Sequence, residues 1–241
     1  MDPVELKDSL VGWIRDWFDR NGKGSVAVLG MSGGKDSTVC AALCAEALGP
    51  DRVVGVSMPA RGQGENDADR ICAHLGIRYM CFPIEGILDS FDALGREFPD
   101  GLSVQTQQNI PPRVRMTVLY AISQSLGGRV VNTCNLSEDW IGYATRWGDS
   151  AGDFSPLGGL VVQEIKAIGH ALGIPSEWVE KTPDDGLPHS CSDEEKFGFT
   201  YAVLDRYIRT GVCEDLRTKE KIDSLHDRNL FKLSMPEHFE P

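Results

Sequence analysis

The 241-residue sequence predicts an α/β fold in which a doubly wound parallel sheet is flanked by helices. Short apolar runs alternate along the chain with stretches of helical periodicity, and this order is typical of parallel strands joined by crossover helices. The first apolar run also ends in a glycine-rich stretch that opens a helix. The length fits one large domain, or at most two small ones, and we expect a single domain over residues 1–241.

The expected strands are short apolar runs bounded by glycine, proline or polar residues. In chain order they cover residues 25–30, 52–58, 77–84 and 129–135. The expected helices are stretches whose apolar residues recur every three to four positions. They cover residues 4–19, 37–48, 65–75, 87–94, 110–128 and 161–172.

Glycine and proline place the ends of these helices. Gly49 and Pro50 terminate the helix after the first strand, and Gly76 terminates the next one. The helix over 110–128 is expected to begin with proline in its first turn and to end at glycines. Beyond it the chain is expected to be mostly helical, apart from a loop over 146–159.

One face of the first helix is apolar at helical spacing. The residues of this stripe are Leu6, Leu10, Trp13, Ile14 and Trp17. One interpretation is that the stripe covers the sheet of its own chain, as most such stripes do. The other is a subunit interface, where large aromatic side chains are enriched.

The composition is ordinary for a soluble globular protein, with a formal net charge of −12. A groove for nucleic acid would need a basic stripe, so this charge argues against nucleic-acid partners. No apolar run is long enough to span a membrane, and the polar N-terminus does not resemble a secretory signal. The seven cysteines include no C-x-x-C pair, which favours buried thiols in a reducing cytoplasm over a zinc or redox site.

Residues 30–37 read GMSGGKDS and join the first expected strand to a helix. Glycines let the backbone approach a ligand closely, and the start of a helix favours an anion. The stretch differs from the phosphate-binding loop of kinases and GTPases, because Gly30 and Gly34 are too close together and Asp36 follows the lysine. A carboxylate beside phosphates is repulsive unless a cation lies between them.

Asp36 therefore predicts Mg²⁺, which prefers one or two carboxylates together with phosphate oxygens and water. Glu138 strengthens this prediction, because it follows another expected strand at a helix start that Ser137 is expected to cap. Parallel strands bring both carboxylates to the same edge of the sheet. The alternative is that each acid only favours the N-terminus of its own helix.

The stretch SGGKDS at 32–37 resembles the SGG-x-DS loop of the N-type ATP pyrophosphatases. The stretches NIPPRVRMTVLYAIS, NTCNLSEDWIGYATRWGDSAGDFSPLGGL and SDEEKFGFTYAVLD are similar to the ammonia-dependent NAD synthetases of that superfamily. The similarity runs in order from about residue 25 to 210, and it is weaker in the stretch NLFKLSMP. It implies the adenine nucleotide alpha-hydrolase-like form of the α/β fold.

The resemblance implies ATP-dependent amidation of deamido-NAD with ammonia, through an adenylated intermediate, with release of AMP and pyrophosphate. It implies ATP as co-substrate and Mg²⁺ as the metal, held by Asp36 and Glu138. The ATP-binding residues that it implies are Gly30, Met31, Ser32, Gly33, Gly34, Lys35, Asp36, Ser37 and Thr133. Thr133 also fits a strand residue that packs its methyl group.

The same resemblance implies that Arg113, Arg146, Asp153 and Lys232 contact deamido-NAD. Asp149 and Asp153 are candidates for assisting ammonia, because ammonium must lose a proton before it can attack. Simpler interpretations stand beside these. Arg113 fits a solvated helix arginine, Asp153 a turn cap and Lys232 a surface charge in a flexible tail.

The chain departs from many relatives at four positions. Val162 stands where many have lysine, and Asp184 where many have threonine or serine. Arg146 occupies a common lysine position and Lys35 a common glutamine position. Lys166 lies one turn after Val162 on an expected helix, so it is a candidate to reach back to ATP, and a solvated helix lysine is the alternative.

Relatives of this family are homodimers, so the resemblance implies a two-fold homodimer whose interface includes the helix at 110–126 and part of the deamido-NAD site. The similar stretches leave no room for a glutaminase domain, so free ammonia is the expected nitrogen donor, and the expected location is the cytoplasm. One alternative is another N-type ATP pyrophosphatase with a different acceptor. The other is a non-catalytic adenine-nucleotide sensor, which would not need both Asp36 and Glu138.

Overall fold

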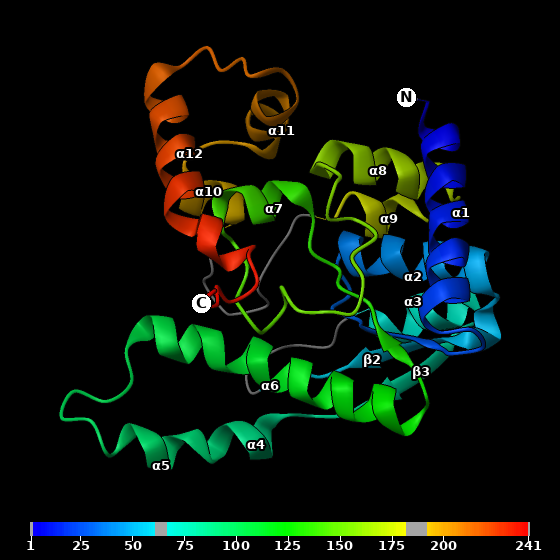
Figure 1. Cartoon of the computed structure of the whole chain (residues 1–241), viewed down its shortest axis with the longest axis horizontal. Coiled ribbons are helices and arrows are strands. Elements are labelled where there is room, and N and C mark those ends of the chain that lie inside the picture. The colour runs from blue at the N-terminus through cyan, green and yellow to red at the C-terminus, as the bar shows by residue number, and fades with distance from the viewer. Residues whose placement is uncertain (1, 61–66, 182–191, 241) are drawn as a thin grey trace.

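The computed structural model of the chain describes residues 2–60, 67–181 and 192–240. Within these ranges a single sheet has four parallel strands in the order β3-β2-β1-β4 (Figure 1). The strands are β1 (Ala27–Gly30), β2 (Val53–Ser57), β3 (Arg78–Cys81) and β4 (Arg129–Val130). Helices join successive strands, and the predicted α/β fold is confirmed.

The remaining elements of the described chain are helices. In chain order the α-helices are α1 (Pro3–Asn21), α2 (Lys35–Leu48), α3 (Ala68–Leu75), α4 (Glu85–Asp89), α5 (Phe91–Gly95), α6 (Val104–Ser125), α7 (Leu136–Ile141), α8 (Val162–Ala171), α9 (Ser176–Val179), α10 (Asp193–Phe197), α11 (Tyr201–Thr210) and α12 (Leu216–Asn229). The short 3₁₀ helices are η1 (Pro50–Arg52) and η2 (Leu230–Lys232). No helix in the described residues is long and apolar enough to cross a membrane.

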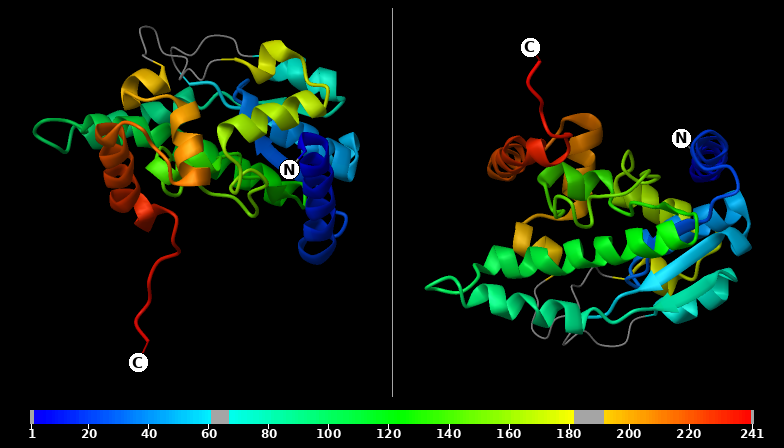
Figure 2. Two further views of the ribbon diagram at one scale, coloured as in Figure 1. Left: turned by 90° about the horizontal axis from the view of Figure 1, so that it is seen from above. Right: turned by 60° about the horizontal axis from the view of Figure 1, so that its bottom comes forward.

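Helices cover both faces of the sheet (Figures 1 and 2). The helices α1, α2, α3, α8 and α9 share a core with one face, in which Leu29 is fully buried. The helices α4 and α6 pack on the other face, in which Val56 is fully buried. A third cluster, built around Leu204, joins α7, α10, α11 and α12 with the first residue of α8.

The apolar stripe of α1 packs on its own chain. Ile14 is fully buried, and Leu6 and Leu10 pack against the same core. The ring of Trp17 stacks on Phe154 with 4.4 Å between centroids. Of the two interpretations of this stripe, the structure therefore supports covering of the chain's own core.

The helix predicted over 110–128 begins earlier, at Val104, so Pro111 and Pro112 lie inside α6 instead of in its first turn. Interior proline removes an N–H donor and usually ends a helix. Here Ile110 and Pro111 line a groove together with Leu88 and other residues of α4 and α5. The helix continues through both prolines next to α4 and α5, which the sequence pattern alone did not reveal.

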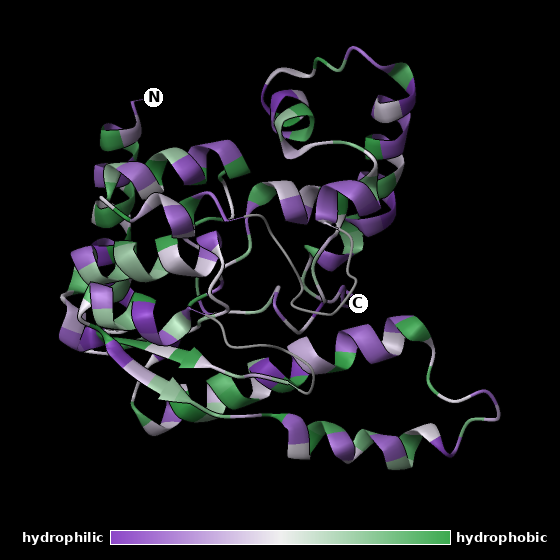
Figure 3. Cartoon of the chain, turned by 180° about the vertical axis from the view of Figure 1, so that it is seen from behind, coloured by the Kyte–Doolittle hydropathy of each residue, from purple (hydrophilic) through white to green (hydrophobic). Residues whose placement is uncertain are grey.

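The segments α4, α5 and the first half of α6 form an arm that projects from the body (Figures 1 and 2). The helix expected over 87–94 is in fact two short helices, because Ser90 separates α4 from α5. Hydrophobic residues alternate with hydrophilic ones along this arm (Figure 3). Several remain exposed, among them Leu94 and Phe98.

The strand predicted over 129–135 is much shorter than expected, since β4 ends at Val130. Val131 still donates to Val28, but it forms only an isolated bridge with Phe154. The chain then leaves the sheet, so that residues 132–135 lie beyond the ends of the strands. This early exit is what frees their polar side chains for contacts at the candidate site.

Candidate active site

The glycine loop, residues 30–37, lies where the direction of strand addition reverses. β1 has β2 on one side and β4 on the other, so the segments after β1 and β4 meet at one crevice beyond the carboxyl ends of the strands. The N–H of Met31 donates to the Val56 carbonyl over 2.8 Å, which ties the loop to β2. Gly33 has a φ of 78°, a left-handed conformation that suits glycine.

Hydroxyl groups line this loop. Ser32 Oγ lies 3.2 Å from Ser37 Oγ and accepts a hydrogen bond from the Gly34 N–H at 3.2 Å. Ser37 is buried and also donates to the Gly34 carbonyl. The first N–H groups of α2 have no acceptor within the helix. The loop therefore presents backbone and hydroxyl donors to an anion.

Asn135 joins the glycine loop to the segment after β4. Its Nδ2 donates to Asp36 Oδ1 at 3.4 Å, and its Oδ1 accepts from the Glu138 N–H at 3.0 Å. Asn135 is fully buried and caps α7, so the prediction that Ser137 is the cap is wrong. Ser137 lies inside α7 and donates to Asp205 at 2.6 Å, because its side chain faces the third cluster.

The Asp36 carboxylate affects the protonation of Glu138. Burial, followed by the neighbouring Asp36 carboxylate, raises the pKa of Glu138 to about 8. The ammonium of Lys35 opposes this shift and donates to Asp36 Oδ2 at 2.8 Å. Two carboxyl groups and one ammonium therefore share the edge of the sheet beside the glycine loop.

A small cavity lies next to this edge. It is lined by Lys35, Val162, Lys166 and Tyr201, among other residues of α2, α8, α10 and α11. Lys166 directs its ammonium to Glu180, with 2.8 Å between Nζ and Oε2. The buried hydroxyl of Tyr201 has no hydrogen-bond partner in the part of the chain that the structure describes.

A second group of side chains surrounds Arg146. The guanidinium of Arg146 lies 5.1 Å from the ring centroid of Trp147 and 5.3 Å from that of Phe231. Its Nη2 donates to the Ser234 carbonyl at 3.0 Å, while its buried Nε has no partner among the described residues. Arg113 donates to the Arg146 carbonyl at 3.2 Å. Trp147 is also the only non-glycine residue with positive φ in the described ranges, at 64°.

Lys232 is held against the loop that follows α7. Its Nζ donates to the carbonyls of Gly142 at 2.8 Å and Ala144 at 3.4 Å. Burial lowers the pKa of Lys232, and the Asp149 carboxylate opposes that shift. Lys232 is therefore a bound side chain near Asp149, which differs from a surface charge in a flexible tail.

The two predicted ammonia-assisting acids occupy different environments. Asp153 accepts from the Val130 N–H at 2.7 Å and from the Tyr120 hydroxyl at 3.3 Å, so both of its oxygens hold the loop to β4 and α6. Asp149 is exposed, as Asp153 is, and its Oδ1 accepts from the Thr145 N–H at 2.9 Å. Desolvation raises the pKa of Asp149, and the hydrogen bond from the Thr145 N–H opposes that shift.

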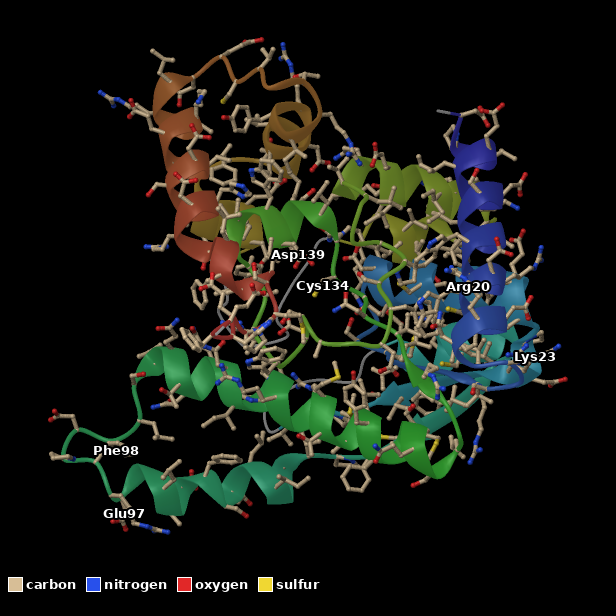
Figure 4. All side chains as sticks on the ribbon, in the orientation of Figure 1. Arg20, Lys23, Glu97, Phe98, Cys134 and Asp139 are labelled. Atoms are coloured by element: carbon tan, nitrogen blue, oxygen red, sulfur yellow. The ribbon has the colours of Figure 1, made fainter. Side chains whose placement is uncertain are left out.

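Asn132 connects this loop to the segment after β4. Its Nδ2 donates to the carbonyls of Asp149 at 2.8 Å and Ala151 at 3.2 Å. Its Oδ1 accepts from the Cys134 N–H at 3.0 Å. Figure 4 shows Cys134 and Asp139, which belong to this region, near the centre of the view, far from Glu97 and Phe98 at the tip of the arm.

The carboxylate pair fits a hard divalent cation in its donor chemistry. Mg²⁺ takes one or two carboxylates and completes its shell with phosphate oxygens and water. No group of three or more acidic, histidine or cysteine side chains in the described ranges is arranged to hold a metal. Asp36 and Glu138 thus suit a cation that arrives with phosphate better than one held by the protein alone.

Three residues of this region, Asn132, Asn135 and Tyr201, were not predicted from the sequence. The signal for the first two was present, since two asparagines follow an apolar run in NTCN. For Tyr201 no pattern distinguished it from an ordinary core tyrosine. Thr133 is half-buried after β4, and Asp184 lies outside the described residues.

The sequence pattern of the NAD synthase family matches residues 6–236. Among curated proteins, the NH(3)-dependent NAD(+) synthetase of Methanococcus aeolicus is 36% identical over 226 residues, which cover 92% of this chain and 87% of that protein. Two solved structures are similar over nearly the whole chain. The NMN synthetase of Francisella tularensis has a TM-score of 0.91 at 28% identity and covers 99% of this chain, which covers 98% of it. The NH3-dependent NAD synthetase of Campylobacter jejuni has a TM-score of 0.79 at 29% identity, with 100% of each chain covered.

Proposed function

Because the chain belongs to the NAD synthase family, we propose that it catalyses the ATP-dependent amidation of deamido-NAD to NAD with ammonia. The observation that carries this proposal is the family match over residues 6–236, which takes in both the glycine loop and the segment around Arg146. The products are NAD, AMP and pyrophosphate. The chain is therefore a ligase that forms a C–N bond.

The chemistry follows from the weakness of a carboxylate as an electrophile. The nicotinate carboxylate attacks the α-phosphorus of ATP, and pyrophosphate departs. The acyl carbon of the resulting mixed anhydride then accepts ammonia, AMP departs, and one proton is released. The protein has to position the reactants and stabilise developing charge.

We place the phosphates of ATP at the glycine loop. The N–H groups at the start of α2 and the hydroxyls of Ser32 and Ser37 suit the departing pyrophosphate. Asp36 and Glu138 would hold Mg²⁺, which when bound would neutralise part of the phosphate charge. Thr133 and Lys166 remain in the proposed ATP-binding set, and Tyr201 joins them because its unpaired hydroxyl lines the same cavity.

We place the acceptor beside Arg146. A guanidinium between two aromatic rings offers both charge and flat surfaces, which suit a ring that carries a carboxylate or a phosphate nearby. Arg113 of α6 and Lys232 of η2 donate to carbonyls of the segment between Gly142 and Arg146, and both are proposed to contact the acceptor as well. Asp153 is proposed to position the loop, because hydrogen bonds engage both of its oxygens.

We propose Asp149 as the group that accepts the proton from ammonium. Hydrogen bonds hold both oxygens of Asp153, whereas Asp149 accepts the Thr145 N–H at Oδ1. Asp149 also lies close enough to Glu138 to raise the pKa of that carboxyl. The short distance between Asp149 and Glu138 brings the loop around Arg146 close to the Asp36–Glu138 pair. The carboxylate of Asp149 can accept a proton from the nitrogen as that nitrogen approaches the acyl carbon.

The direct test is incubation of the purified chain with ATP, Mg²⁺, deamido-NAD and ammonium chloride. We expect NAD, AMP and pyrophosphate in equal amounts. Glutamine in place of ammonium chloride should give no NAD, because free ammonia is the proposed donor. ADP and phosphate as the only nucleotide products would disprove the proposal.

A second candidate acceptor is the deamidated mononucleotide, nicotinate mononucleotide. The structure that carries the name NMN synthetase has a TM-score of 0.91, against 0.79 for the Campylobacter jejuni NAD synthetase. The same adenylation and amidation would serve a smaller acceptor. The ratio of kcat/KM for the two acceptors, measured with both present, decides between them.

We further propose that the protein is a cytoplasmic homodimer. The six described cysteines are free, in keeping with a reducing compartment. The cavity at the glycine loop is too small to enclose a long dinucleotide. A subunit interface that includes α6 would let a second copy of the chain cover the rest of that ligand.

A further inference from the structure

Lys35 is a buried lysine at the first position of α2. Its side chain is only 2% exposed, although lysine is almost never buried unless it is paired. The residue belongs to the glycine loop, where backbone donors already serve an anion. The buried ammonium therefore calls for an account of its own.

Acidic groups from three helices surround this ammonium. It donates to Asp36 Oδ2 at 2.8 Å, and Asp36 itself is 19% exposed. Asn135 holds Glu138 beside Asp36, and Asp193 lines the same cavity as Lys35. The ammonium also lies 5.9 Å from the ring centroid of Tyr201. Lys35 is thus the buried counter-ion of the Asp36–Glu138 pair.

The same side chain borders the cavity beside the glycine loop. Val162 lines that cavity too and contributes no charge. Lys166 and Lys181 border it but pair with Glu180 and Asp67, respectively. Of the lysines that line the cavity in the described chain, Lys35 alone has its ammonium on the carboxylate pair.

We propose that the Lys35 ammonium occupies the Asp36–Glu138 pair in the free protein and moves to phosphate oxygens when the metal–nucleotide complex binds. This inference rests on the proposed function, and it gives Lys35 a role that backbone donors cannot fill. The free protein keeps its carboxylates neutralised without a metal. A bare divalent cation then has to compete with an ammonium, whereas a cation that brings phosphate gives that ammonium a new partner.

The proposal makes opposite predictions for two binding equilibria. In Lys35→Met, Mn²⁺ without nucleotide should bind at least about fivefold more tightly, because a competing charge within hydrogen-bond distance has gone. The complex of Mg²⁺ with α,β-methylene ATP should bind at least about fivefold more weakly, because a phosphate contact has gone. Electron paramagnetic resonance measures the first affinity and isothermal titration calorimetry the second.

The matched control is Lys181→Met, which removes a lysine from the same cavity that pairs with Asp67. It should change the Mn²⁺ affinity by less than about twofold, because its ammonium is not on the carboxylate pair. If Lys35→Met does not fold, Lys35→Gln keeps a polar side chain and undergoes the same two titrations.

Each outcome decides the proposal. Unchanged Mn²⁺ binding in Lys35→Met refutes occupancy of the pair, and tighter binding of both ligands refutes the transfer to phosphate. Weaker binding of both assigns Lys35 a structural role only. These titrations need no acceptor, so they remain readable even if the wild type forms no NAD, which would count against the proposed function instead.

Discussion

Asn135 shows how one side chain can assemble a site. It donates to Asp36 and accepts from the Glu138 backbone, so a carboxylate from each of two segments is fixed by a buried amide. An amide carries no charge, and it therefore orders the two acids without neutralising them. The cation that balances them has to come from Lys35 or from a ligand.

The first prediction concerns these two acids. Asp36→Asn and Glu138→Gln should each lower the turnover number at least about 100-fold, because a charge that would hold Mg²⁺ against the phosphates is lost. Folding stability should fall much less than turnover, since both replacements keep the shape of the side chain, and Asp36→Asn loses only one of the two hydrogen bonds that Asp36 accepts. Steady-state assays and thermal melts provide the two measurements.

Asp51→Asn, a change in the exposed turn η1, serves as the control for loss of an acid in general. It should leave turnover unaltered. Near wild-type rates for Asp36→Asn and Glu138→Gln at limiting magnesium would show that the two acids do not share a metal.

The second prediction concerns the pH dependence of stability at Asp139. Burial, followed by Asp149, raises the pKa of Asp139 from 3.8 to about 6, and its buried Oδ1 has no partner among the described residues. A raised carboxyl pKa means that the folded state holds the proton more tightly than the unfolded state. The associated stability is present below about pH 4 and is lost as the pH rises through about 6.

Asp139→Asn should therefore match the wild type near pH 4 and exceed its unfolding free energy by about 1–2 kcal/mol at pH 7, a range reduced for partial exposure. Urea denaturation with EDTA across this pH range measures the difference. A difference that stays constant with pH would contradict the account.

At the scale of single residues, the sequence predicted Asp36 and Glu138 as metal ligands and Arg146 as a contact of deamido-NAD, because motifs and strand ends can be recognised along the chain. It could not reveal that Asn135, and not Ser137, caps α7. Either residue type caps helices well, so only the exit of the chain from β4 decides between them. It also could not show that Lys232 bonds to backbone carbonyls 88 to 90 residues away.

At the scale of elements, Gly142 connects α7 to the C-terminal helix. Gly142 has a φ of 69°, and a Cβ there would lie 2.2 Å from the Cβ of Asn229. Asn229 ends α12 and donates to the Ile141 carbonyl at 3.2 Å, while the Gly142 carbonyl accepts from Lys232. The turn after α7 therefore contacts both the end of α12 and Lys232, which is proposed to contact the acceptor.

The third prediction is that Gly142→Ala lowers the free energy of unfolding by at least about 2 kcal/mol and raises the KM for the acceptor. The added methyl group would push α12 and Lys232 away from the loop. Gly127→Ala is a matched control, because Gly127 has a φ of 62° but open space around its Cα. That control should cost only about 1–2 kcal/mol, from the left-handed backbone alone. Equal losses in the two variants would rule out the contact with Asn229.

Most helices could be predicted from periodicity, and α1, α2, α3 and α8 begin and end close to the expected positions. The failures share a cause. α6 continues through Pro111 and Pro112 because α4 and α5 pack against it, and β4 stops early because Phe154 takes the place of a longer strand partner. Both are tertiary contacts, which local sequence does not encode.

At the scale of the whole molecule, α8 belongs to two cores. Val162 packs in the cluster with α11 and α12, whereas Ile165 and Ile168 pack in the cluster with α1 and α2. We propose on this basis that residues 1–241 form one domain. The fourth prediction is a single calorimetric transition, with a ratio of calorimetric to van't Hoff enthalpy of about 1. Two separable transitions would instead show that the third cluster is a unit of its own.

The fifth prediction concerns assembly. Light scattering after gel filtration at micromolar concentration should give twice the monomer mass of 26.4 kDa. Ala121 lies on the exposed side of α6, so Ala121→Arg should shift the mass to the monomer and raise the KM for the acceptor. Ala202→Arg, a change at an exposed position of α11, should alter neither the mass nor the KM for the acceptor. A monomer that keeps full activity on dilution would defeat the proposed dimer.

The hydrogen bond between Asp36 and Asn135 joins residues that are 99 positions apart. Closing so long a loop carries an entropic cost that is recovered only when the strands between these residues have paired. We therefore expect the proposed phosphate and metal site to be completed late in folding. A chain diluted out of urea would regain its helical signal first and its capacity to bind nucleotide only after β4 has docked on β1. Nucleotide binding thus reports the final step of folding, which circular dichroism does not distinguish.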